Sequence, residues 1–372
     1  MSSAPLDPAP LNVTDLLAGK RVCICTGPGG VGKTTTSAAI ALGMAALGLK
    51  VAVVTIDPAR RLANALGLAE LSNEPALVPA AKLSDHGITI TGELWAMMLD
   101  PKRTFDELID QIAPTPERAA EIKSNRVYEQ ISGAVSGSQE FTAVSKLYEL
   151  VTGNDYDLIV LDTPPSRNAL DFFDAPTRLT AFLEGRALRA LLRPTGFGMK
   201  LFGFGIAPLL GGLRRITGID LIQDLNTFFT LLGDMTEGFS LRARHVDRLL
   251  RDPSTALLTI TSPQRAPTDE AIRLRQMLAA QQMTLGGAIV NRFHAPLPEP
   301  DPSRLSTLLG PELAAKVISA QRDHALLARR DQLNIERLRS ELKGDPLLLV
   351  PEFTEDVHDI RGLLRVHAHL FG

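Results

Sequence analysis

One glycine-rich segment constrains the fold of this chain more than any other feature. Residues 27–34 read Gly-Pro-Gly-Gly-Val-Gly-Lys-Thr and fit the phosphate-loop pattern G-x-x-x-x-G-K-[ST] in full. Residues 21–26 predict a buried strand before the loop, and the Ala- and Leu-rich residues 35–47 predict a helix after it. A strand, a glycine loop and a helix in that order form the setting in which this motif binds phosphate.

Each part of the loop has a chemical role in that setting. Glycines let main-chain N–H groups crowd around phosphate oxygens, and the start of the helix adds unpaired N–H groups. We expect Lys33 to reach the β- and γ-phosphates and the Thr34 hydroxyl to bind Mg²⁺. The alternative is a glycine-rich turn that matches by accident. The nucleotide-binding residues expected here are Gly27, Gly29, Gly30, Val31, Gly32, Lys33, Thr34 and Thr35.

Apolar β-rich runs recur along the rest of the chain, with helical patterns between them. Runs that lack polar alternation are typical of parallel strands covered by helices on both faces. The sequence therefore predicts an α/β fold with a doubly wound, mostly parallel sheet and a helical insertion subdomain. The predicted strands are 22–26, 51–56, 94–99, 158–161, 256–260, 288–290 and 347–350, and helical patterns include 268–281 and 354–370.

The chain of 372 residues is long enough for one large elaborated domain or for two domains. Residues 1–18 read as a flexible tail, and residues 19–372 as a phosphate-loop domain with helical elaborations at about 101–151 and 172–252. The second elaboration holds nine of the 14 Phe residues, which need a core of their own or form an exposed apolar surface.

Charge and composition narrow the functional classes. The net charge of −3 gives no general case for a nucleic-acid partner, and none is expected. The sequence shows no secretory signal and no apolar run long enough to span a membrane. Cys23 and Cys25, the only cysteines, lie in the first predicted strand, and no further cysteine could complete a disulfide framework. We expect a soluble protein of the reducing cytoplasm.

Two acidic residues follow predicted strands. Ligands of doubly wound sheets bind beyond the carboxyl ends of the strands, which puts Asp57 near the γ-phosphate. A carboxylate there could orient or deprotonate an attacking water, although Asp57 could instead cap the turn at Pro58. Residues 158–162 form a Walker-B-like run that ends in Asp162, close to Mg²⁺, unless the run is simply another strand that ends in a turn. The expected catalytic residues are Lys33, Asp57 and Asp162, and the expected metal ligands are Thr34, Asp57 and Asp162.

A polar residue also ends the predicted strand 288–290. The Asn291 amide carries both a donor and an acceptor and can pair with the edge of adenine. Guanine presents two adjacent donors and normally requires a carboxylate three residues later, where this chain has His294. The pattern favours ATP, although Asn291 could serve only as a turn former.

As a set, these segments resemble the ArsA-type ATPases, which include the arsenite-pump ATPase and the ATPase that delivers tail-anchored membrane proteins. The resemblance rests on the phosphate loop, Asp57-Pro58-Ala59, Asp162-Thr163-Pro164-Pro165 and Val290-Asn291. It implies ATP and Mg²⁺ as cofactors, and a dimer that closes around ATP while hydrolysis drives the opening and closing of a helical surface. It also implies that the loop containing Pro351 lies beside the adenine.

The chain departs from that family at the second position of the loop. The family usually has a lysine there that reaches the partner's phosphates, whereas this chain has Pro28, which lacks a charge and a main-chain N–H. Arg60 or Arg61 could substitute, or a different partner subunit could supply the lysine, so both a homodimer and a heterodimer with a related ATPase subunit are expected alternatives.

The cysteines and the insertion also differ from the family pattern. Cys23 and Cys25 can provide neither the thiolates of the arsenite branch nor a Cys-x-x-Cys zinc clamp. The first half of the insertion, residues 178–215, carries a net charge of +6 (seven Lys and Arg against Glu184) and is glycine-punctuated. Three interpretations stay open: a groove for an apolar client helix, docking on an anionic membrane surface, or an ordinary helical subdomain with solvated arginines.

The sequence thus predicts a Mg²⁺-dependent ATP hydrolase that acts as a dimeric conformational switch and handles hydrophobic clients such as membrane proteins. The main alternative is a regulatory or partitioning-type phosphate-loop ATPase that binds membrane or DNA. A third is the ATPase subunit of an anion transporter, which the cysteine pattern disfavours.

Overall fold

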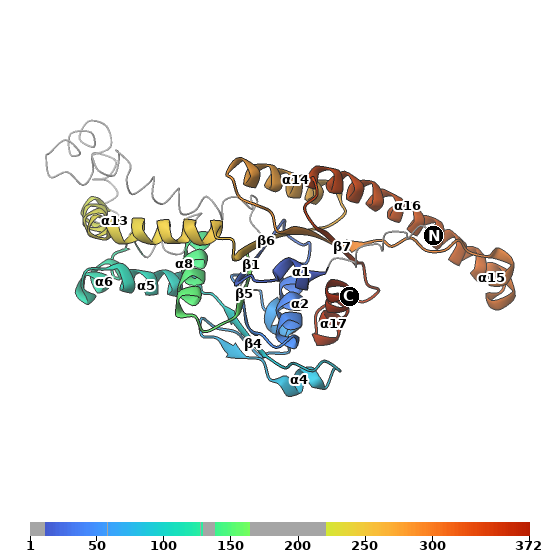
Figure 1. Ribbon diagram of the computed structural model, residues 1–372, viewed down its shortest axis with the longest axis horizontal. Coiled ribbons are helices and arrows are strands. Elements are labelled where there is room, and N and C mark those ends of the chain that lie inside the picture. Colours follow the sequence, from blue (N-terminus) through green and yellow to red (C-terminus); the bar gives the residue numbers. More distant parts are fainter. Residues whose placement is uncertain (1–11, 58, 127, 129–137, 164–220) are drawn as a thin grey trace, which may run out of the picture. The chain divides into compact units, whose positions relative to one another are not determined.

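The computed structural model describes residues 12–57, 59–126, 128, 138–163 and 221–372 (Figure 1). Contacts divide the chain into two compact units. The first, the sheet unit, contains residues 1–98, 154–169 and 253–372. The second, the helical unit, contains residues 99–153 and 170–252. No helix in the described ranges is both long enough and apolar enough to cross a lipid bilayer.

The sheet unit is built on one eight-stranded sheet with the order β3-β4-β2-β5-β1-β6-β7-β8. All neighbouring strands are parallel except β3 and β4, so the predicted α/β fold with a mostly parallel sheet is confirmed. Each predicted strand occurs, with boundaries shifted by no more than a few residues, and central strands such as β1 and β5 are apolar runs buried on both faces. The strands are β1 (Val22–Thr26), β2 (Lys50–Thr55), β3 (Ala76–Leu77), β4 (Glu93–Met98), β5 (Leu158–Asp162), β6 (Thr255–Thr261), β7 (Gly287–Phe293) and β8 (Leu347–Pro351).

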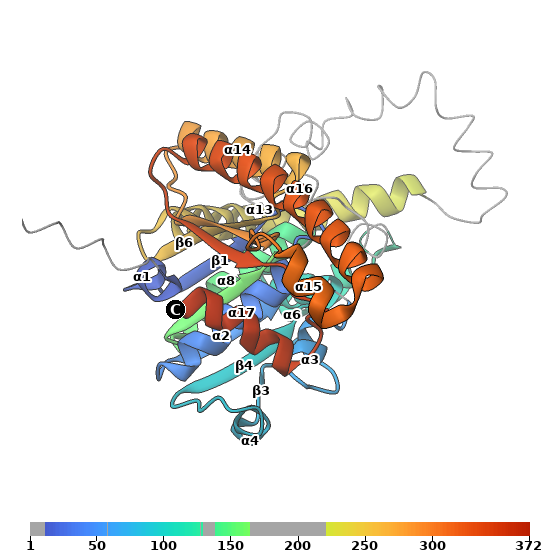
Figure 2. The ribbon, with the colours of Figure 1, turned by 90° about the vertical axis from the view of Figure 1, so that its right-hand side faces the viewer.

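Helices cover both faces of this sheet (Figure 2). One face carries α2 (Lys33–Ala46) and α17 (Ile360–Phe371), which pack tightly enough that a Cβ at Gly43 would lie 2.3 Å from the Phe371 ring. The opposite face carries α14 (Arg265–Ala280) and α16 (Pro311–Leu342). The short helices α3 (Arg61–Ala65), α4 (Ala80–Ser84) and α15 (Pro302–Leu309) lie in connections. This arrangement leaves the carboxyl ends of the central strands open to a ligand.

The flexible tail predicted for residues 1–18 includes a helix in the structure. Helix α1 (Val13–Leu17) begins at a capping box in which Asn12 and Asp15 each accept a hydrogen bond from the other's main-chain N–H. Its apolar residues Val13, Leu16 and Leu17 follow the i, i+3, i+4 spacing and are buried in the main core. Residues 1–11 lie outside the described residues, so the expectation of a tail is wrong for 12–17 and stays a prediction for the rest.

Other differences concern helices. The pattern at 354–370 predicts one helix, but α17 begins only at Ile360, because Asp359 caps it through a 2.8 Å hydrogen bond from the Gly362 N–H. The sequence analysis assigns no element between 290 and 347, where the structure has α15 and the 32-residue α16. Most of the side chains in the first half of α16 are exposed, and apart from Ala314 its buried apolar residues, Ala328, Ile335, Leu338 and Leu342, all lie in the second half.

The helical unit has a core of its own. It contains α5 (Pro101–Ile112), α6 (Pro116–Lys123), α8 (Ser138–Gly153) and α13 (Leu221–Arg251). Phe239 of α13 stacks on Phe105 of α5 with the ring centroids 6.2 Å apart, and Phe228 is also buried in this cluster. Two of the Phe residues that suggested an exposed surface therefore stabilise the unit itself. Those between 172 and 204 lie outside the described residues.

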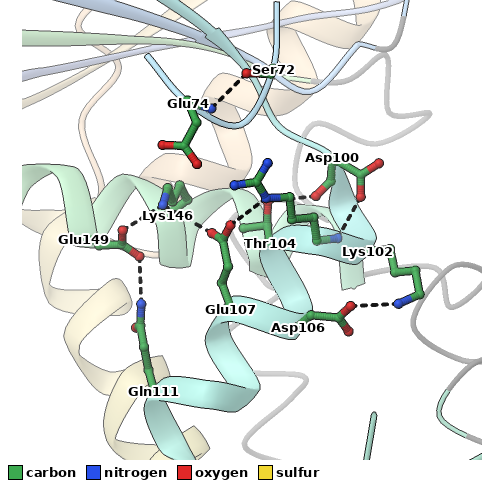
Figure 3. Close-up of polar contacts among 11 residues, drawn as sticks. Ser72, Glu74, Asp100, Lys102, Thr104, Asp106, Glu107, Gln111, Lys146 and Glu149 are labelled. Atoms are coloured by element: carbon green, nitrogen blue, oxygen red, sulfur yellow. Dashed lines mark hydrogen bonds and ion pairs between the residues drawn. The ribbon is translucent and has the colours of Figure 1, made fainter. Parts of the chain in front are cut away.

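Polar contacts join these helices as well. Figure 3 shows Lys146 of α8 between two carboxylates, with its Nζ 3.4 Å from Glu107 of α5 and 2.7 Å from Glu149 of α8. Glu149 also accepts a 3.0 Å hydrogen bond from Gln111 of α5. Burial alone lowers the pKa of Lys146, but the two carboxylates outweigh it and hold the pKa above its ordinary value.

Candidate functional site

The glycine-rich loop connects β1 to α2 at the carboxyl edge of the sheet. Gly32 adopts a left-handed conformation (φ 89°) directly before Lys33 begins the helix, and a Cβ there would lie 2.3 Å from the Asn291 side-chain nitrogen. Gly27 also has a positive φ, and its Cβ would lie 1.9 Å from the Ile260 main-chain oxygen. Both close approaches exclude any side chain, so the loop is shaped by its neighbours β6 and β7.

The Lys33 side chain is buried, with 7% of its surface exposed, and its Nζ donates a 3.0 Å hydrogen bond to the Pro28 main-chain oxygen. Burial lowers the Lys33 pKa, and the charges of Asp162, Glu270 and Asp57 oppose that effect. The lysine thus folds back over its own loop, in the position from which it can meet a phosphate inside the loop.

Asp162 lies at the end of β5 behind Lys33 and the helix start. Its Oδ2 accepts hydrogen bonds from the Thr34 hydroxyl at 2.6 Å and from the Thr55 hydroxyl at 2.8 Å. Its Oδ1 is buried and has no hydrogen-bond partner among the described residues. Burial raises the Asp162 pKa to about 6, and the two threonine hydrogen bonds only partly offset it.

This donor set fits a hard divalent cation. Mg²⁺ prefers carboxylate, hydroxyl and water oxygens, and the structure brings the Thr34 hydroxyl and the Asp162 carboxylate together, as the sequence predicts for two of the three metal ligands. A buried carboxylate with an unpartnered oxygen is costly without a cation beside it. Thr55 completes the cluster and was not predicted, since a threonine that ends a buried strand gives no distinctive signal.

Asp57 lies two residues after the end of β2. Its contacts bear on both roles considered for it, the cap of a turn and the catalytic carboxylate. Its Oδ1 accepts a 2.9 Å hydrogen bond from the Ala59 N–H, which is the turn-capping role. Its Oδ2 lies 3.6 Å from a guanidinium nitrogen of Arg61, whose side chain is 66% exposed. The charge of Asp57 influences the pKa of both Lys33 and Asp162, so the three predicted catalytic residues form one electrostatic cluster.

The segment after Asp162 is described only at its first residue. Thr163 is buried and donates its hydroxyl to the Cys25 main-chain oxygen at 2.9 Å, so it fastens the end of β5 to β1. Residues 164–166 lie outside the described residues.

Asn291 of β7 approaches the loop from the other side. Its Nδ2 donates a 2.8 Å hydrogen bond to the Val31 main-chain oxygen, so the side chain braces the phosphate loop. The amide also lines a pocket of about 180 Å³ together with Gly32, Thr35, Glu352, Phe353 and Val357. Pro351 ends β8 immediately before Glu352 and Phe353, which places the segment expected beside the base at this pocket.

Glu270 of α14 belongs near this cluster, although no sequence pattern singled it out. One of its oxygens is buried without a hydrogen-bond partner among the described residues. Burial raises its pKa, and the positive charge of Lys33 opposes that rise. The position inside an ordinary amphipathic helix gives no signal for this proximity.

Comparison with known proteins decides the family. Residues 20–307 match the family model described as "Anion-transporting ATPase", which is more than three quarters of the chain. The chain belongs to the anion-transporting ATPase family. The resemblance inferred from the loop, Asp57, Asp162 and Asn291 is therefore confirmed at the level of the family, and the chain is assigned as an ATPase.

The chain is also similar, at lower than 30% identity, to several individual ATPases. It is similar to ATPase ARSA2 of Chlamydomonas reinhardtii, with 28% identity over 293 residues that cover 78% of this chain and 72% of the relative. It is also similar to ATPase get3 of Schizosaccharomyces japonicus, with 24% identity over 291 residues, 77% of this chain and 80% of the relative. ATPase get3 of Botryotinia fuckeliana shares 26% identity over 274 residues, 73% and 71% of the two chains.

Proposed function

We propose that this chain is a Mg²⁺-dependent ATP hydrolase that works as a dimeric conformational switch. The observation that carries the proposal is the Asp162 carboxylate, which is 1% exposed, binds the Thr34 and Thr55 hydroxyls and keeps one oxygen without a described partner. A charge buried in this way beside a phosphate loop requires a cation.

The protein residues divide the work of hydrolysis between them. Thr34 and Asp162 would hold Mg²⁺, which when bound neutralises charge on the phosphate oxygens. The loop N–H groups and Lys33 bind and orient the phosphates. Asp57 Oδ1 is occupied by the Ala59 N–H, and Oδ2 has only the ion-pair contact with the exposed Arg61 side chain, so Oδ2 is the oxygen that would orient the attacking water and accept its proton.

The orientation of Asn291 supports ATP as the nucleotide. Its Nδ2 donates one of its two hydrogens to the Val31 oxygen, so the amide oxygen and the second N–H are left for a base in the adjoining pocket, the acceptor and the donor that the edge of adenine requires. Adenine carries a donor amino group at the position where guanine carries an acceptor oxygen, so an acceptor there discriminates in favour of adenine. His294 occupies the place of the carboxylate that guanine would require.

The phosphate loop of this protein lacks the lysine that its family usually has at the second position. Pro28 stands there, and its main-chain oxygen accepts the hydrogen bond from Lys33. Arg60 or Arg61 of the same chain, or a lysine of a different partner subunit, remain the proposed substitutes. Arg61 is exposed and its guanidinium lies at the Asp57 carboxylate, so it is well placed for that role.

We further propose that the switch handles hydrophobic clients such as membrane proteins and acts in the cytoplasm. Two relatives are ATPases named get3, and the helical unit supplies an element separate from the sheet. Both cysteines are free, buried thiols, as is normal in a reducing compartment. The client groove was expected in the insertion, and the basic first half of that insertion, residues 178–215, lies outside the described residues, so the groove stays a prediction.

Purified protein tests the enzymatic part directly. Wild-type protein should release phosphate from ATP in the presence of Mg²⁺, and Lys33→Ala and Asp57→Asn should each lose at least about a hundredfold in turnover. Retained ATP binding by Asp57→Asn would separate chemistry from binding. Wild-type protein that neither binds nor hydrolyses ATP would overturn the proposal.

Capture from cells tests the client part. Asp57→Asn protein purified with ATP should retain membrane proteins with apolar tails, while Lys33→Ala protein should not. Recovery of DNA or lipid instead would favour the regulatory or partitioning class.

A further inference from the structure

A second pocket, of about 160 Å³, lies against the phosphate loop, and neither Thr34 nor Asp162 lines it. Gly29 and Gly30 of the loop form part of its lining, and Arg292, His294, Arg330 and Glu352 supply charged or polar side chains. These side chains come from β7, α16 and the end of β8, which are far apart in sequence. Arg330 has no part in the account of nucleotide binding given above.

A buried carboxylate holds this cluster from behind. Asp331 of α16 has no exposed surface in its side chain and does not line the pocket. Its Oδ2 accepts hydrogen bonds from the His294 N–H at 3.0 Å and from His294 Nδ1 at 2.7 Å. Its Oδ1 accepts from Arg330 Nε at 3.0 Å and from Arg330 Nη2 at 2.7 Å. With four donors bound, Asp331 is an anchor whose charge is already compensated.

Arg330 is the cation that this anchor presents to the pocket. Its Nε and Nη2 are fixed by Asp331, which leaves Nη1 and the second Nη2 hydrogen for a ligand. Its side chain is 49% exposed, so it remains accessible. A guanidinium held at two points loses little conformational freedom when it binds an anion.

Arg292 also lines this pocket, and it occupies an irregularity of the sheet. It is the extra residue of a β-bulge between Asn291 and Phe293, with a left-handed φ of 64° that non-glycine residues seldom adopt. Its Nη2 lies 3.2 Å from Glu352 Oε1, and the other Glu352 oxygen lies 3.2 Å from His294 Nε2. The Glu352 carboxylate, which lines the pocket, is thus already paired with Arg292 and His294.

We propose that Arg330, oriented by Asp331 and His294, is a phosphate-binding residue for ATP and provides the positive charge that Pro28 cannot. The ligand is a phosphate of a nucleotide held in a phosphate loop, either this chain's own or that of a second copy facing the same surface. Glycine N–H groups on one wall and an anchored guanidinium on the other are the features that bind phosphate oxygens. The inference rests on the ATPase function proposed above.

The matched comparison is Arg330→Ala against Arg329→Ala. Both arginines are exposed on α16, but only Arg330 binds Asp331 and lines the pocket. Arg330→Ala should weaken ATP binding by about tenfold and ADP binding less, and it should flatten the dependence of ATP affinity on salt concentration. Arg329→Ala should bind ATP like wild type. Arg330→Lys should recover part of the affinity, because it restores the charge without the two-point contact.

Thermal unfolding separates a binding role from a structural one. Arg330→Ala that binds ATP as wild type does, at equal folded fraction, would overturn the proposal. A uniform loss of affinity for ATP, ADP and adenosine would overturn it too, because a phosphate ligand requires a loss that grows with the number of phosphates. Wild-type and Arg329→Ala proteins that fail to bind ATP would instead overturn the proposed function itself.

Mixing two defective variants identifies the source of the phosphate. Arg330→Ala has an intact phosphate loop, and Lys33→Ala has an intact Arg330. Recovery of ATP hydrolysis on mixing supports a contact with the nucleotide of a second copy. No recovery, together with weakened binding by Arg330→Ala alone, supports a contact within one chain.

Discussion

Asn291 donates its side-chain N–H to the Val31 main-chain oxygen across 2.8 Å. The bond ties the end of β7 to the phosphate loop at a point where Gly32 leaves no room for a side chain. The Asn291 amide therefore links the pocket proposed for the base to the loop proposed for the phosphates. A change at Asn291 should disturb phosphate binding as well as the choice of base.

Asn291→Asp tests this coupling. A carboxylate cannot donate to the Val31 oxygen and places two acceptors against each other, so ATP and ADP affinity should fall by about tenfold or more. Isothermal titration with both nucleotides measures the effect. Unchanged affinity for ADP would show that the contact does not shape the loop.

Two glycines of the loop offer a controlled comparison. Gly30 and Gly32 both have positive φ, but a Cβ at Gly30 would meet nothing within 4 Å, whereas at Gly32 it would lie 2.3 Å from the Asn291 amide. Gly30→Ala should cost only the conformational penalty of about 1–2 kcal/mol. Gly32→Ala should lower the free energy of unfolding further and abolish nucleotide binding. Equal effects of the two substitutions in denaturant titrations would contradict the clash.

Asp162 should make stability depend on pH in the absence of metal. Its folded-state pKa of about 6 lies above the ordinary 3.8, so folding favours the protonated acid. The associated stability is present below about pH 4 and is lost as the pH rises through about 6, amounting to about 3 kcal/mol at most. Asp162→Asn should remove this dependence, although the nearby charges of Lys33 and Asp57 stay. The measurement is the unfolding temperature of wild-type and Asp162→Asn protein in EDTA from pH 5 to 8. If the unfolding temperatures of the two proteins changed with pH in parallel, the expectation would be wrong.

The helical unit contains a matched pair of lysines. Lys146 is 13% exposed and lies between Glu107 and Glu149, whereas Lys102 is 54% exposed and pairs with Asp106 on the surface. Lys146→Ala should lower the free energy of unfolding by about 1–3 kcal/mol, because Glu149 loses the ion pair with this lysine and Glu107, which also pairs with Arg103, loses one of its ion pairs. Lys102→Ala should cost less than about 1 kcal/mol. Chemical denaturation measures the free energy of unfolding of both variants. A larger loss of this free energy in Lys102→Ala than in Lys146→Ala would contradict the role of Lys146.

The strands of the sheet could be predicted from the sequence because both of their faces are buried. β2 and β5, for example, are continuous apolar runs that end in Thr55 and Asp162. The phosphate loop likewise has a pattern that fixes its neighbours. Such features depend on residues close together in the chain, which sequence patterns report well.

The rest depends on contacts between distant residues. The Thr55 hydroxyl reaches Asp162 over 107 positions of sequence, and nothing in either segment indicates that contact. Helix α16 was not predicted, and the first half of its length is mostly solvent-exposed, with its buried apolar residues, Ala314 apart, confined to the second half. Asp331 was not predicted either, since a lone acid in a polar helix gives no sign that it is buried against His294.

The left-handed residue in β7 has a consequence for how this site is assembled. In a regular strand, side chains three positions apart point to opposite sides. The additional residue at Arg292 changes that count, and as a result Asn291 and His294 both approach the phosphate loop. A regular ladder that kept Arg292 would place the Asn291 and His294 side chains on opposite sides, so this irregularity lets one strand end reach both the phosphate loop and the pocket beside it.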